Sequence, residues 1–447
     1  MQNNYWNKEL ETLPWAELEQ WQTGQITDFV SSLVGRSIMY DGLLEGIAHR
    51  PLRDINDLAR LPFTTKLDLR NAVTDCATDL TFGNNQSALS EDIVQAVSSS
   101  GTTGAPMYYA LTRDDLRDWT DAIANTFFTA GLRPTDSIAH LVGLPGVAGG
   151  LPYADGFRAI GATTFWLGGF PTERILKEIG RLKLNTILAT TSFGSYLAEL
   201  VEQGNSDAKD ITLEKFISGG EPGLGQPEIR AKIARGMGTE QIREVMGLGD
   251  VLSAMWSECE CQDGMHFNAQ KYVAIELIDP DSEDRIDWQP GAHGELVYTT
   301  FRRQATPVLR YRSRDHVEII DTRCDCGRTS PRMRCIGRTD DMLIYKGMNV
   351  FPGTIRDLVA QRLNDSLLPQ IRVWKDSKDQ VRFDRPIPVD VEARPGIDAS
   401  RFPQLADQVA DMIRQQLQVR VAVNVVASGE LPRSVYKTPL TYIKGID

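Results

Sequence analysis

The sequence lacks the features that mark membrane, secreted or nucleic-acid-binding proteins. It contains no apolar run long enough to span a bilayer. Residues 1–13, MQNNYWNKELETL, show no signal-peptide pattern, so we expect a cytoplasmic protein. The 48 Lys and Arg residues are outnumbered by 60 Asp and Glu residues, giving a net charge of -12. This balance argues against nucleic acid or an anionic membrane as the main partner.

Cysteine is also scarce, with only six among the 447 residues. In a reducing compartment, clustered cysteines are metal ligands or inert core residues more often than disulfides. Three thiolates and one imidazole would make a closed tetrahedral set for a structural zinc ion. The candidate ligands are Cys259, His266, Cys324 and Cys326, with Cys261 as the alternative to His266. Free reduced thiols are the other interpretation.

The order of strand-like and helix-like segments predicts an α/β protein of at least two domains. Strand and helix patterns alternate through residues 137–235, which predicts a parallel sheet with crossover helices. Short antiparallel strands follow from residue 272 and predict a β-rich subdomain. A polar stretch, 337–341, then precedes a small α+β domain. We therefore expect a large N-terminal domain, 1–339, and a C-terminal domain, 340–447.

A loop rich in Ser, Thr and Gly follows the strand-like run 93–97. Its glycines let the backbone approach a ligand closely, and its N–H and hydroxyl groups suit a triphosphate. No Walker lysine follows it, and a flexible surface loop is the alternative. Gly101, Gly219 and Gly247 all follow strand-like runs, so three loops should meet at one edge of the sheet. The candidate phosphate-binding residues are Ser99, Ser100, Gly101, Thr102, Thr103 and Gly104.

Several motifs, in this order, resemble the acyl-adenylate-forming superfamily and within it the phenylacetate–CoA ligases. They are YWN at 5–7, LPFTTK at 61–66, SSGTTG at 99–104, SGGEP at 218–222, GLGD at 247–250, YRSRD at 311–315, GRTDDMLI at 337–344 and LPRSVYK at 431–437. The resemblance implies that a carboxylate attacks the α-phosphorus of ATP to give acyl-AMP and pyrophosphate. A thiol, usually that of CoA, then displaces AMP. ATP, Mg²⁺ and CoA are the implied cofactors.

The resemblance also implies roles for residues in the last third of the chain. Lys437 matches the adenylation lysine, whose charge would bridge the carboxylate and the α-phosphate, with Lys444 as the other candidate. Asp315 matches the ribose-binding aspartate, and Arg338 would support the ribose or a phosphate. Asp340 would be the hinge about which a mobile small domain rotates between the two half-reactions.

Further residues are implied to form the adenine, metal and acid sites. The adenine site would comprise Gly219, Gly220, Glu221, Pro222, Glu244 and Gly247. The candidate acyl pocket is formed by Gly219, Met246, Met255 and Tyr153, whose glycine-rich surroundings suggest an aromatic or arylacetic acid. Asp250 takes the place of the magnesium-binding glutamate. Zinc sites with the present cysteine pattern occur in some members of the superfamily.

Four positions depart from the family pattern. Ala105 replaces a lysine, Met246 an aromatic residue, Gly249 a Ser or Thr, and Asp250 a glutamate. The departures leave two alternatives to a CoA ligase open. One is adenylation followed by transfer to a carrier-protein thiol or a nitrogen nucleophile, and the other is a non-catalytic, zinc-stabilised binding protein. The sequence is compatible with a homodimer and leaves the oligomeric state open.

Overall fold

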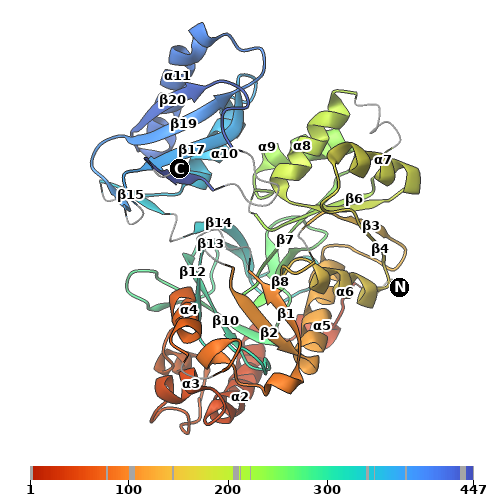
Figure 1. The fold of residues 1–447 in the computed structure, drawn as a ribbon, viewed down its shortest axis with the longest axis vertical. Helices are drawn as coiled ribbons and strands as arrows, with labels where there is room; N and C mark the ends of the chain where they lie inside the picture. Colours follow the sequence, from red (N-terminus) through yellow and green to blue (C-terminus); the bar gives the residue numbers. More distant parts are fainter. Residues whose placement is uncertain are drawn as a thin grey trace. The chain divides into compact units, whose positions relative to one another are not determined.

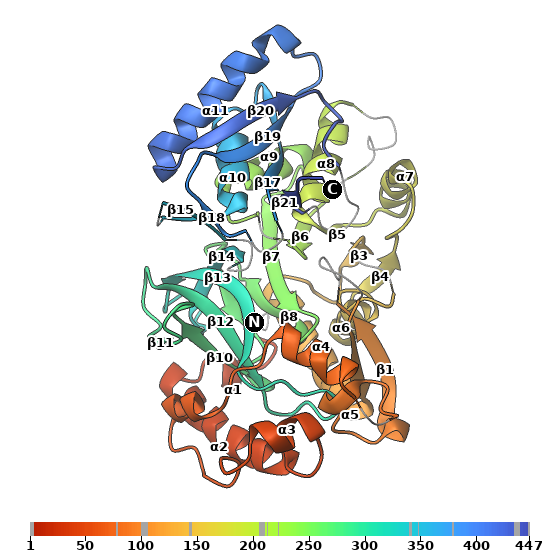
Figure 2. The same ribbon diagram turned by 60° about the vertical axis from the view of Figure 1, so that its left-hand side comes forward.

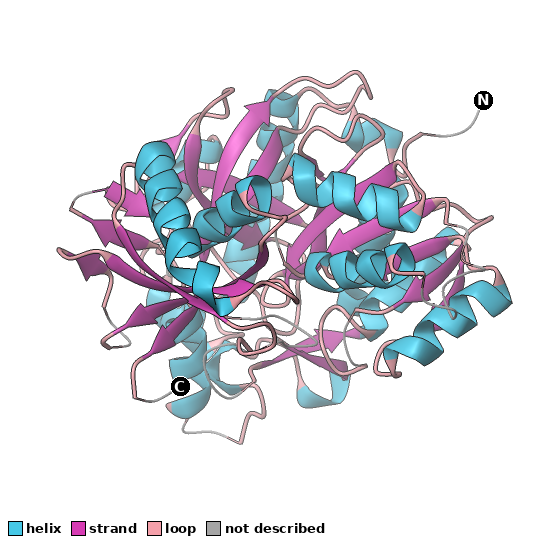
Figure 3. Cartoon of the chain, turned by 90° about the horizontal axis from the view of Figure 1, so that it is seen from above, coloured by secondary structure: helices cyan, strands magenta, loops and turns pink. Residues whose placement is uncertain are grey.

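A computed structural model describes residues 4–76, 79–99, 106–142, 145–204, 211, 213–221, 223–338, 342–346, 348–377, 380–432 and 439–445. The chain divides into two compact units (Figure 1). The larger unit comprises Met1–Glu221, Ile233–Ser313 and Val317–Arg334. The smaller unit comprises Pro222–Lys232, Arg314–His316 and Cys335–Asp447. Each unit is built of helices packed against strands (Figure 3).

The main sheet has twelve strands within the described residues, in the order β11-β10-β12-β13-β14-β9-β8-β7-β6-β5-β3-β4. One end of it is parallel, as the alternating pattern predicted. Its parallel strands are β3 (Ser137–His140), β4 (Thr163–Trp166), β5 (Thr186–Ala189), β6 (Lys215–Gly219) and β7 (Gln241–Leu248). The intervening helices are α6 (Leu151–Ile160), α7 (Thr172–Leu182), α8 (Thr191–Glu202) and α9 (Pro227–Met237).

The predicted β-rich region continues this sheet instead of forming a sheet of its own. The change of direction occurs at β8 (Leu252–Glu258), which pairs antiparallel with β7. The remaining strands are β9 (Met265–Phe267), β10 (Val273–Ile278), β11 (Arg285–Ile286), β12 (His293–Thr300), β13 (Tyr311–Asp321) and β14 (Arg332–Arg338). The fold is therefore the expected α/β type with a β-rich region.

The strand before the Ser/Thr/Gly loop does not belong to the parallel sheet, whose edge we expected it to share. This strand, β1 (Ile93–Ser98), pairs antiparallel with β2 (Tyr108–Thr112) in a separate two-stranded sheet. Its end is instead tied to the loop that follows β3. Ser98 donates its backbone N–H to the Gly146 carbonyl at 2.9 Å and accepts from the Ala148 N–H at 3.0 Å. The end of β1 is thus held against the loop that follows β3.

Two helices of the larger unit begin at capping boxes. Helix α5 (Arg113–Thr129) has a capping box between Thr112 and Asp115. Helix α4 (Lys66–Thr74) has one between Thr65 and Asp68. In each box the hydroxyl and the carboxylate satisfy backbone donors that the first helical turn leaves free. These caps fix where α4 and α5 start.

The first helices pack on the antiparallel end of the sheet (Figure 2). They are α1 (Lys8–Glu11), α2 (Trp15–Leu33) and α3 (Ile38–Leu43). Ile26, Val30 and Leu33 recur at helical spacing on one face of α2 and pack in a buried cluster with Ala274 of β10 and Phe301. No helix in the described part of the chain has the length and apolarity needed to cross a membrane.

The smaller unit has its own core, built on a four-stranded sheet of order β20-β19-β17-β21. These strands are β17 (Leu367–Lys375), β19 (Ile387–Ala393), β20 (Val421–Val426) and β21 (Thr441–Ile443). Val373 and Val389 of the sheet lie in one cluster with Ile355 of α10 (Pro352–Arg362) and Val409 of α11 (Phe402–Leu417). Three short strands, β15 (Leu343–Tyr345), β16 (Met348–Val350) and β18 (Arg382–Phe383), make a further sheet.

Candidate active site

Several predicted site residues lie outside the described residues. They are Ser100, Gly101, Thr102, Thr103, Gly104, Pro222, Asp340 and Lys437. Of the predicted phosphate loop, Ser99 is described. It is buried, and its backbone N–H donates to the Met107 carbonyl at 2.9 Å, so the pairing of β1 with β2 holds it in place. Lys444, the alternative to Lys437, is exposed on the smaller unit and pairs with Asp376 at 3.1 Å.

Three loops converge at Gly249, in the turn after β7. A Cβ atom on Gly249 would lie 3.0 Å from the Ala148 Cβ and 3.6 Å from the Ser99 Cα. The turn therefore lies against both the end of β1 and the loop that follows β3. A Ser or Thr at position 249 would need its neighbours to shift. This packing gives the departure at Gly249 a physical reason.

Asp250 is buried and already engaged by two donors. Lys66 Nζ lies 3.2 Å from its Oδ1, and the Tyr109 hydroxyl donates to the same oxygen. The Lys66 ammonium also donates to Ser99 Oγ at 3.3 Å. Burial, followed by the nearby Asp250 carboxylate, raises the pKa of Tyr109 above its ordinary value, so this hydroxyl keeps its proton. The predicted metal ligand thus sits in a hydrogen-bonded cluster.

Arg303 supports the same turn from inside the protein. Its Nη1 donates to the backbone carbonyls of Asp250 at 2.8 Å and Val251 at 3.0 Å. Burial lowers the pKa of Arg303 from its ordinary value, although Asp115 opposes the shift. Sequence reasoning assigned no role to Lys66, Tyr109 or Arg303. The position of Lys66 in the LPFTTK motif was a weak signal of a role. The residues that Lys66 contacts are distant in the chain, so the sequence did not show them together.

The predicted adenine residues lie on the neighbouring strands β6 and β7. Gly219 ends β6, where a Cβ atom would approach the Val245 Cγ2 to 2.8 Å. Gly220 has a φ of 91°, a left-handed conformation that glycine adopts without strain. Glu221 accepts from the Ser192 N–H at 2.6 Å and so lies at the first turn of α8. Glu244 is buried and lies opposite Ser218 where β6 pairs with β7.

Gly247 occupies an irregularity in the pairing of β7 with β8. The register shifts between Met246 and Leu248. A Cβ atom on Gly247 would overlap the backbone carbonyl of Ser253. The motif glycine is therefore required by a close approach of two strands. Met246 lies opposite Trp256 in the same ladder.

The other predicted acyl-pocket residues are held firmly in the core. Tyr153 is buried and donates its hydroxyl to the Ser253 carbonyl at 2.6 Å. Met255, two residues after Ser253 on β8, is fully buried. The Tyr153 ring stacks on His140 at 6.2 Å between ring centroids. Burial lowers the pKa of His140 to about 4, so this imidazole is neutral at physiological pH.

The predicted ribose aspartate and its supporting arginine are adjacent. Arg338 Nη1 lies 3.2 Å from Asp315 Oδ1. Arg314, the residue before Asp315, has a φ of 66°, which is uncommon for a residue with a side chain. Such backbone strain persists only where the surroundings impose it and is often found at functional sites. The residue types around Arg314 do not signal this conformation.

The four candidate zinc ligands are gathered at one point. The ligand atoms of Cys259, His266, Cys324 and Cys326 lie within 4.8 Å of one another. Cys261 is exposed, and its N–H donates to the Cys259 sulfur at 3.4 Å. The sequence left open whether His266 or Cys261 is the fourth ligand, and the geometry favours His266.

The spacing of these atoms fits a tetrahedral zinc ion. Zn–S bonds of about 2.3 Å place two sulfurs about 3.8 Å apart, and a Zn–N bond of about 2.0 Å places N and S about 3.5 Å apart. Cys259 and Cys324 sulfurs are 3.7 Å apart, and the Cys326 sulfur is 3.4 Å from His266 Nε2. His266 Nδ1 lies 3.3 Å from the Ser330 carbonyl, which orients the ring with Nε2 toward the sulfur.

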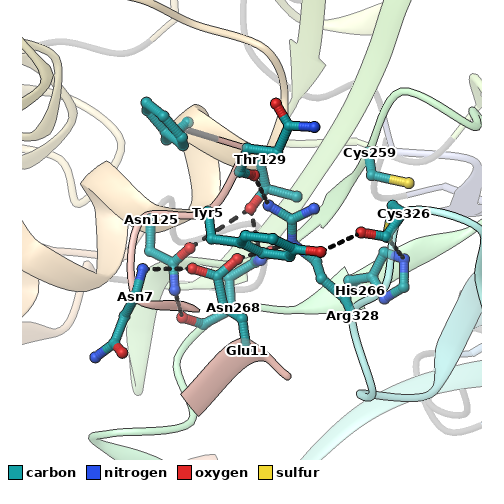
Figure 4. Close-up of polar contacts among 12 residues, drawn as sticks. Tyr5, Asn7, Glu11, Asn125, Thr129, Cys259, His266, Asn268, Cys326 and Arg328 are labelled. Atoms are coloured by element: carbon teal, nitrogen blue, oxygen red, sulfur yellow. Dashed lines mark hydrogen bonds and ion pairs between the residues drawn. The ribbon is translucent and has the colours of Figure 1, made fainter. Parts of the chain in front are cut away.

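The N-terminal segment packs against the turn that carries two of these cysteines (Figure 4). Tyr5 donates its hydroxyl to the Cys326 carbonyl at 2.7 Å. Arg328, in the same turn, forms a buried ion pair with Glu11 and donates to the Asn4 carbonyl at 2.8 Å. The cluster therefore joins the first residues of the chain to residues more than three hundred positions later.

Comparisons with known proteins agree on one group. Residues 347–441 match the model of the AMP-binding enzyme C-terminal domain. A phenylacetate-coenzyme A ligase of Thermus thermophilus is 30% identical over 95% of this chain and 96% of its own. One of Escherichia coli is 29% identical over 95% and 94%. A structure of 2-hydroxyisobutyryl-CoA ligase with 2-HIB-AMP has a TM-score of 0.87 at 22% identity, over 99% of this chain and 93% of that one.

Proposed function

This chain belongs to the phenylacetate–CoA ligase family, whose members are AMP-forming acid–thiol ligases, and on that premise we propose that it converts an aromatic or arylacetic acid to its CoA thioester. The observation that carries the proposal is the convergence at Gly249 of the end of β1, the loop after β3 and the turn after β7. This is where the family's phosphate loop and acid motif must meet. The close packing at position 249 explains why this chain has Gly there instead of Ser or Thr. This departure from the family pattern therefore does not require an acceptor other than CoA.

In the first step, a carboxylate oxygen of the acid attacks the α-phosphorus of ATP. A new O–P bond forms, the bond to the bridging oxygen breaks, and pyrophosphate leaves with its electron pair. Because both reactants are anionic, positive charge must lie between them. We assign this charge to Lys437, and the binding of the ribose hydroxyls to Asp315 with Arg338 beside it.

In the second step, the thiolate of CoA attacks the acyl carbon, and AMP leaves. We propose that Asp340 is the hinge between domains 1–339 and 340–447, and that rotation about it exchanges the residues serving the two steps. Gly219, Gly220, Glu221, Pro222, Glu244 and Gly247 are proposed to surround the adenine, and Gly219, Met246, Met255 and Tyr153 the acyl group. Ser99 to Gly104 are proposed to bind the phosphates. Placement in the cytoplasm and a homodimer remain predictions of the sequence.

Magnesium is expected to accompany ATP, and the family resemblance implies Asp250 as its ligand. Asp250 as found fits this role poorly, because its Oδ1 already accepts from Lys66 and Tyr109. Mg²⁺ demands a regular shell of oxygen ligands and gives up its waters reluctantly. A cationic ammonium beside the same oxygen opposes a second cation there.

Zinc fits its proposed site, and its role there is structural. Cys259, His266, Cys324 and Cys326 would fill all four tetrahedral positions and leave none open for a substrate. The bound ion would hold the Cys324–Cys326 turn against β9. Through Tyr5 and Arg328, it would also hold the N-terminal segment.

The experiment that tests the function is a panel of aromatic and aliphatic acids assayed with ATP. We expect pyrophosphate release with aromatic or arylacetic acids and a CoA thioester only when CoA is present. Lys437→Ala should abolish acyl-AMP formation, whereas Lys444→Ala should retain most of it. Acyl-AMP formation without a CoA product would favour another acceptor, and no release with any acid would favour a binding protein.

A further inference from the structure

A cleft of about 580 Å³ lies at the start of helix α2, between the loop that carries Trp288 and the turn that carries Cys324 and Cys326. Sites for small molecules commonly have volumes of about 300 to 1,000 Å³, so the cleft is large enough for one. Its lining shares no residue with the proposed ATP and acyl sites. The cleft is therefore a candidate site for a separate ligand.

Two tryptophans form the aromatic part of the wall. Trp15 is the first residue of α2, and Trp288 lies in the loop between β11 and β12. Their rings meet edge to face, with 6.2 Å between the ring centroids and an angle of 80° between the planes. Both residues are only partly buried, and Ala16 and Pro331 extend the apolar surface beside them. A flat apolar ring can pack well against such a surface.

The charged residues that line the cleft are both cations, Arg323 and Arg328. Arg328 is buried, and its charge is neutralised by Glu11 at 2.9 Å. Arg323 is exposed, and its guanidinium has no ion-pair partner within the described part of the chain. Arg323 is therefore the cation that is available to a ligand.

The surroundings of Arg323 also favour an anion. Thr322 contributes a hydroxyl to the lining. Helix α2 begins after Pro14 without a side-chain cap, so the positive end of its dipole faces the same region. Among the described residues, none with a carboxylate lines the cleft. Three carboxylates lie against its lining residues, and each has a cationic partner, in the pairs Glu11–Arg328, Glu19–Arg285 and Asp321–Arg332.

We propose that this cleft binds a small aromatic carboxylate, whose anionic group pairs with Arg323 and whose ring packs against Trp15 and Trp288. A planar guanidinium can donate two parallel hydrogen bonds to one carboxylate, which gives the pair both strength and orientation. A ligand held in this way contacts both α2 and the Cys324–Cys326 turn, so it stabilises the larger unit. The site is additional to the proposed acyl pocket and does not depend on the proposed function.

The test is fluorine NMR of the full-length protein labelled with 5-fluorotryptophan, with 2-naphthoate as the probe. The chain has eight tryptophans, and Trp15→Phe and Trp288→Phe identify the two resonances that matter. We expect 2-naphthoate to shift both resonances until they saturate, in the absence of ATP. Acetate, which lacks the ring, and 2-naphthylmethanol, which lacks the charge, should shift them much less. A probe bound in the acyl pocket alone would leave both resonances in place, so the test is independent of the proposed function.

Two variants test the charge. Arg323→Met should weaken 2-naphthoate binding about 10- to 100-fold, because a charge-assisted hydrogen bond is lost. Arg36→Met, at another exposed arginine of the larger unit, is the matched control and should bind like the wild type. Ala16→Glu adds a carboxylate to the lining at a helix position that favours one, so it should weaken binding without lowering the melting temperature.

Three results would overturn the proposal. The first is that 2-naphthoate leaves the Trp15 and Trp288 resonances unshifted. The second is that Arg323→Met binds 2-naphthoate as tightly as Arg36→Met does. The third is that the uncharged 2-naphthylmethanol binds as tightly as 2-naphthoate, because the cleft would then select the ring alone.

Discussion

Arg328 Nε and Glu11 Oε2 lie 2.9 Å apart, and their side chains are 1% and 0% exposed. The second Glu11 oxygen accepts from the Asn7 N–H at 2.6 Å. This buried ion pair joins helix α1 to the turn that carries Cys324 and Cys326. Its two partners come from opposite ends of the larger unit's sequence, so it closes the fold of that unit around the cysteine–histidine cluster.

Glu11→Gln should destabilise the larger unit substantially. Removing one partner leaves the buried Arg328 guanidinium without the carboxylate that pairs with it, which costs about 3 to 5 kcal/mol. The free energy of unfolding by urea measures this loss. Glu9→Gln, at an exposed position of the same helix, is the control and should change stability by less than about 0.5 kcal/mol. Equal stability of the two variants would mean that the ion pair does not anchor α1.

The purified protein should contain about one zinc ion per chain, measured by elemental mass spectrometry. Cys326→Ser removes one of the four ligands and should lose most of the metal together with several degrees of melting temperature. Cys335→Ser, outside the cluster, should keep its zinc. A wild type purified without chelators that contains no zinc would contradict the assignment.

The free energy of unfolding of the larger unit should decrease as the pH is lowered, because of the buried His140. Its pKa is about 4 in the folded protein and about 6.5 in an unfolded chain. Between these values the unfolded chain binds one more proton, so the free energy of unfolding decreases as pH falls, by about 3 kcal/mol in total. Denaturant titrations from pH 7 to pH 4.5 measure the slope.

His140→Phe should have a shallower slope than the wild type over this range. His49→Gln, at an exposed position, should keep the wild-type slope. Identical slopes in wild type and His140→Phe would show that the buried imidazole takes up its proton without unfolding.

Gly247→Ala should cost about 1 to 3 kcal/mol of stability, because the new methyl group meets the Ser253 backbone rather than a movable side chain. Gly24→Ala provides the matched control. Gly24 lies within α2 and has open space where its Cβ would be, so alanine there should stabilise by about 0.5 to 1 kcal/mol. Urea unfolding of both variants measures the contrast, and a neutral Gly247→Ala would show that β7 and β8 can separate at this point.

Local patterns in the sequence were sufficient to predict much of the fold. The alternation of strands and helices through residues 137–235 and the antiparallel strands that follow residue 272 were predicted from hydrophobic periodicity. The separate pairing of β1 with β2 could not be predicted, because a short apolar run does not say which strand it joins. The two short stretches that carry Cys259 with His266 and Cys324 with Cys326 pointed to the cluster, but the choice between His266 and Cys261 needed the structure.

The site was less predictable than the fold. Lys66, Tyr109 and Arg303 meet Asp250 from three separate elements, and only the folded chain brings them together. The strained backbone at Arg314 likewise leaves no mark in the residue types around it. The sequence showed Gly249 only as a departure from the family pattern, whereas the structure shows that the end of β1 and the loop after β3 pack closely against it.

The most direct test of the proposed function is mass spectrometry of the products formed from ATP, Mg²⁺ and phenylacetate, with and without CoA. We predict acyl-AMP with pyrophosphate in the absence of CoA, and phenylacetyl-CoA with AMP in its presence, with both lost in Lys437→Ala. Absence of acyl-AMP with phenylacetate and with every other acid of the panel would contradict the assignment of this chain as an acid-activating ligase.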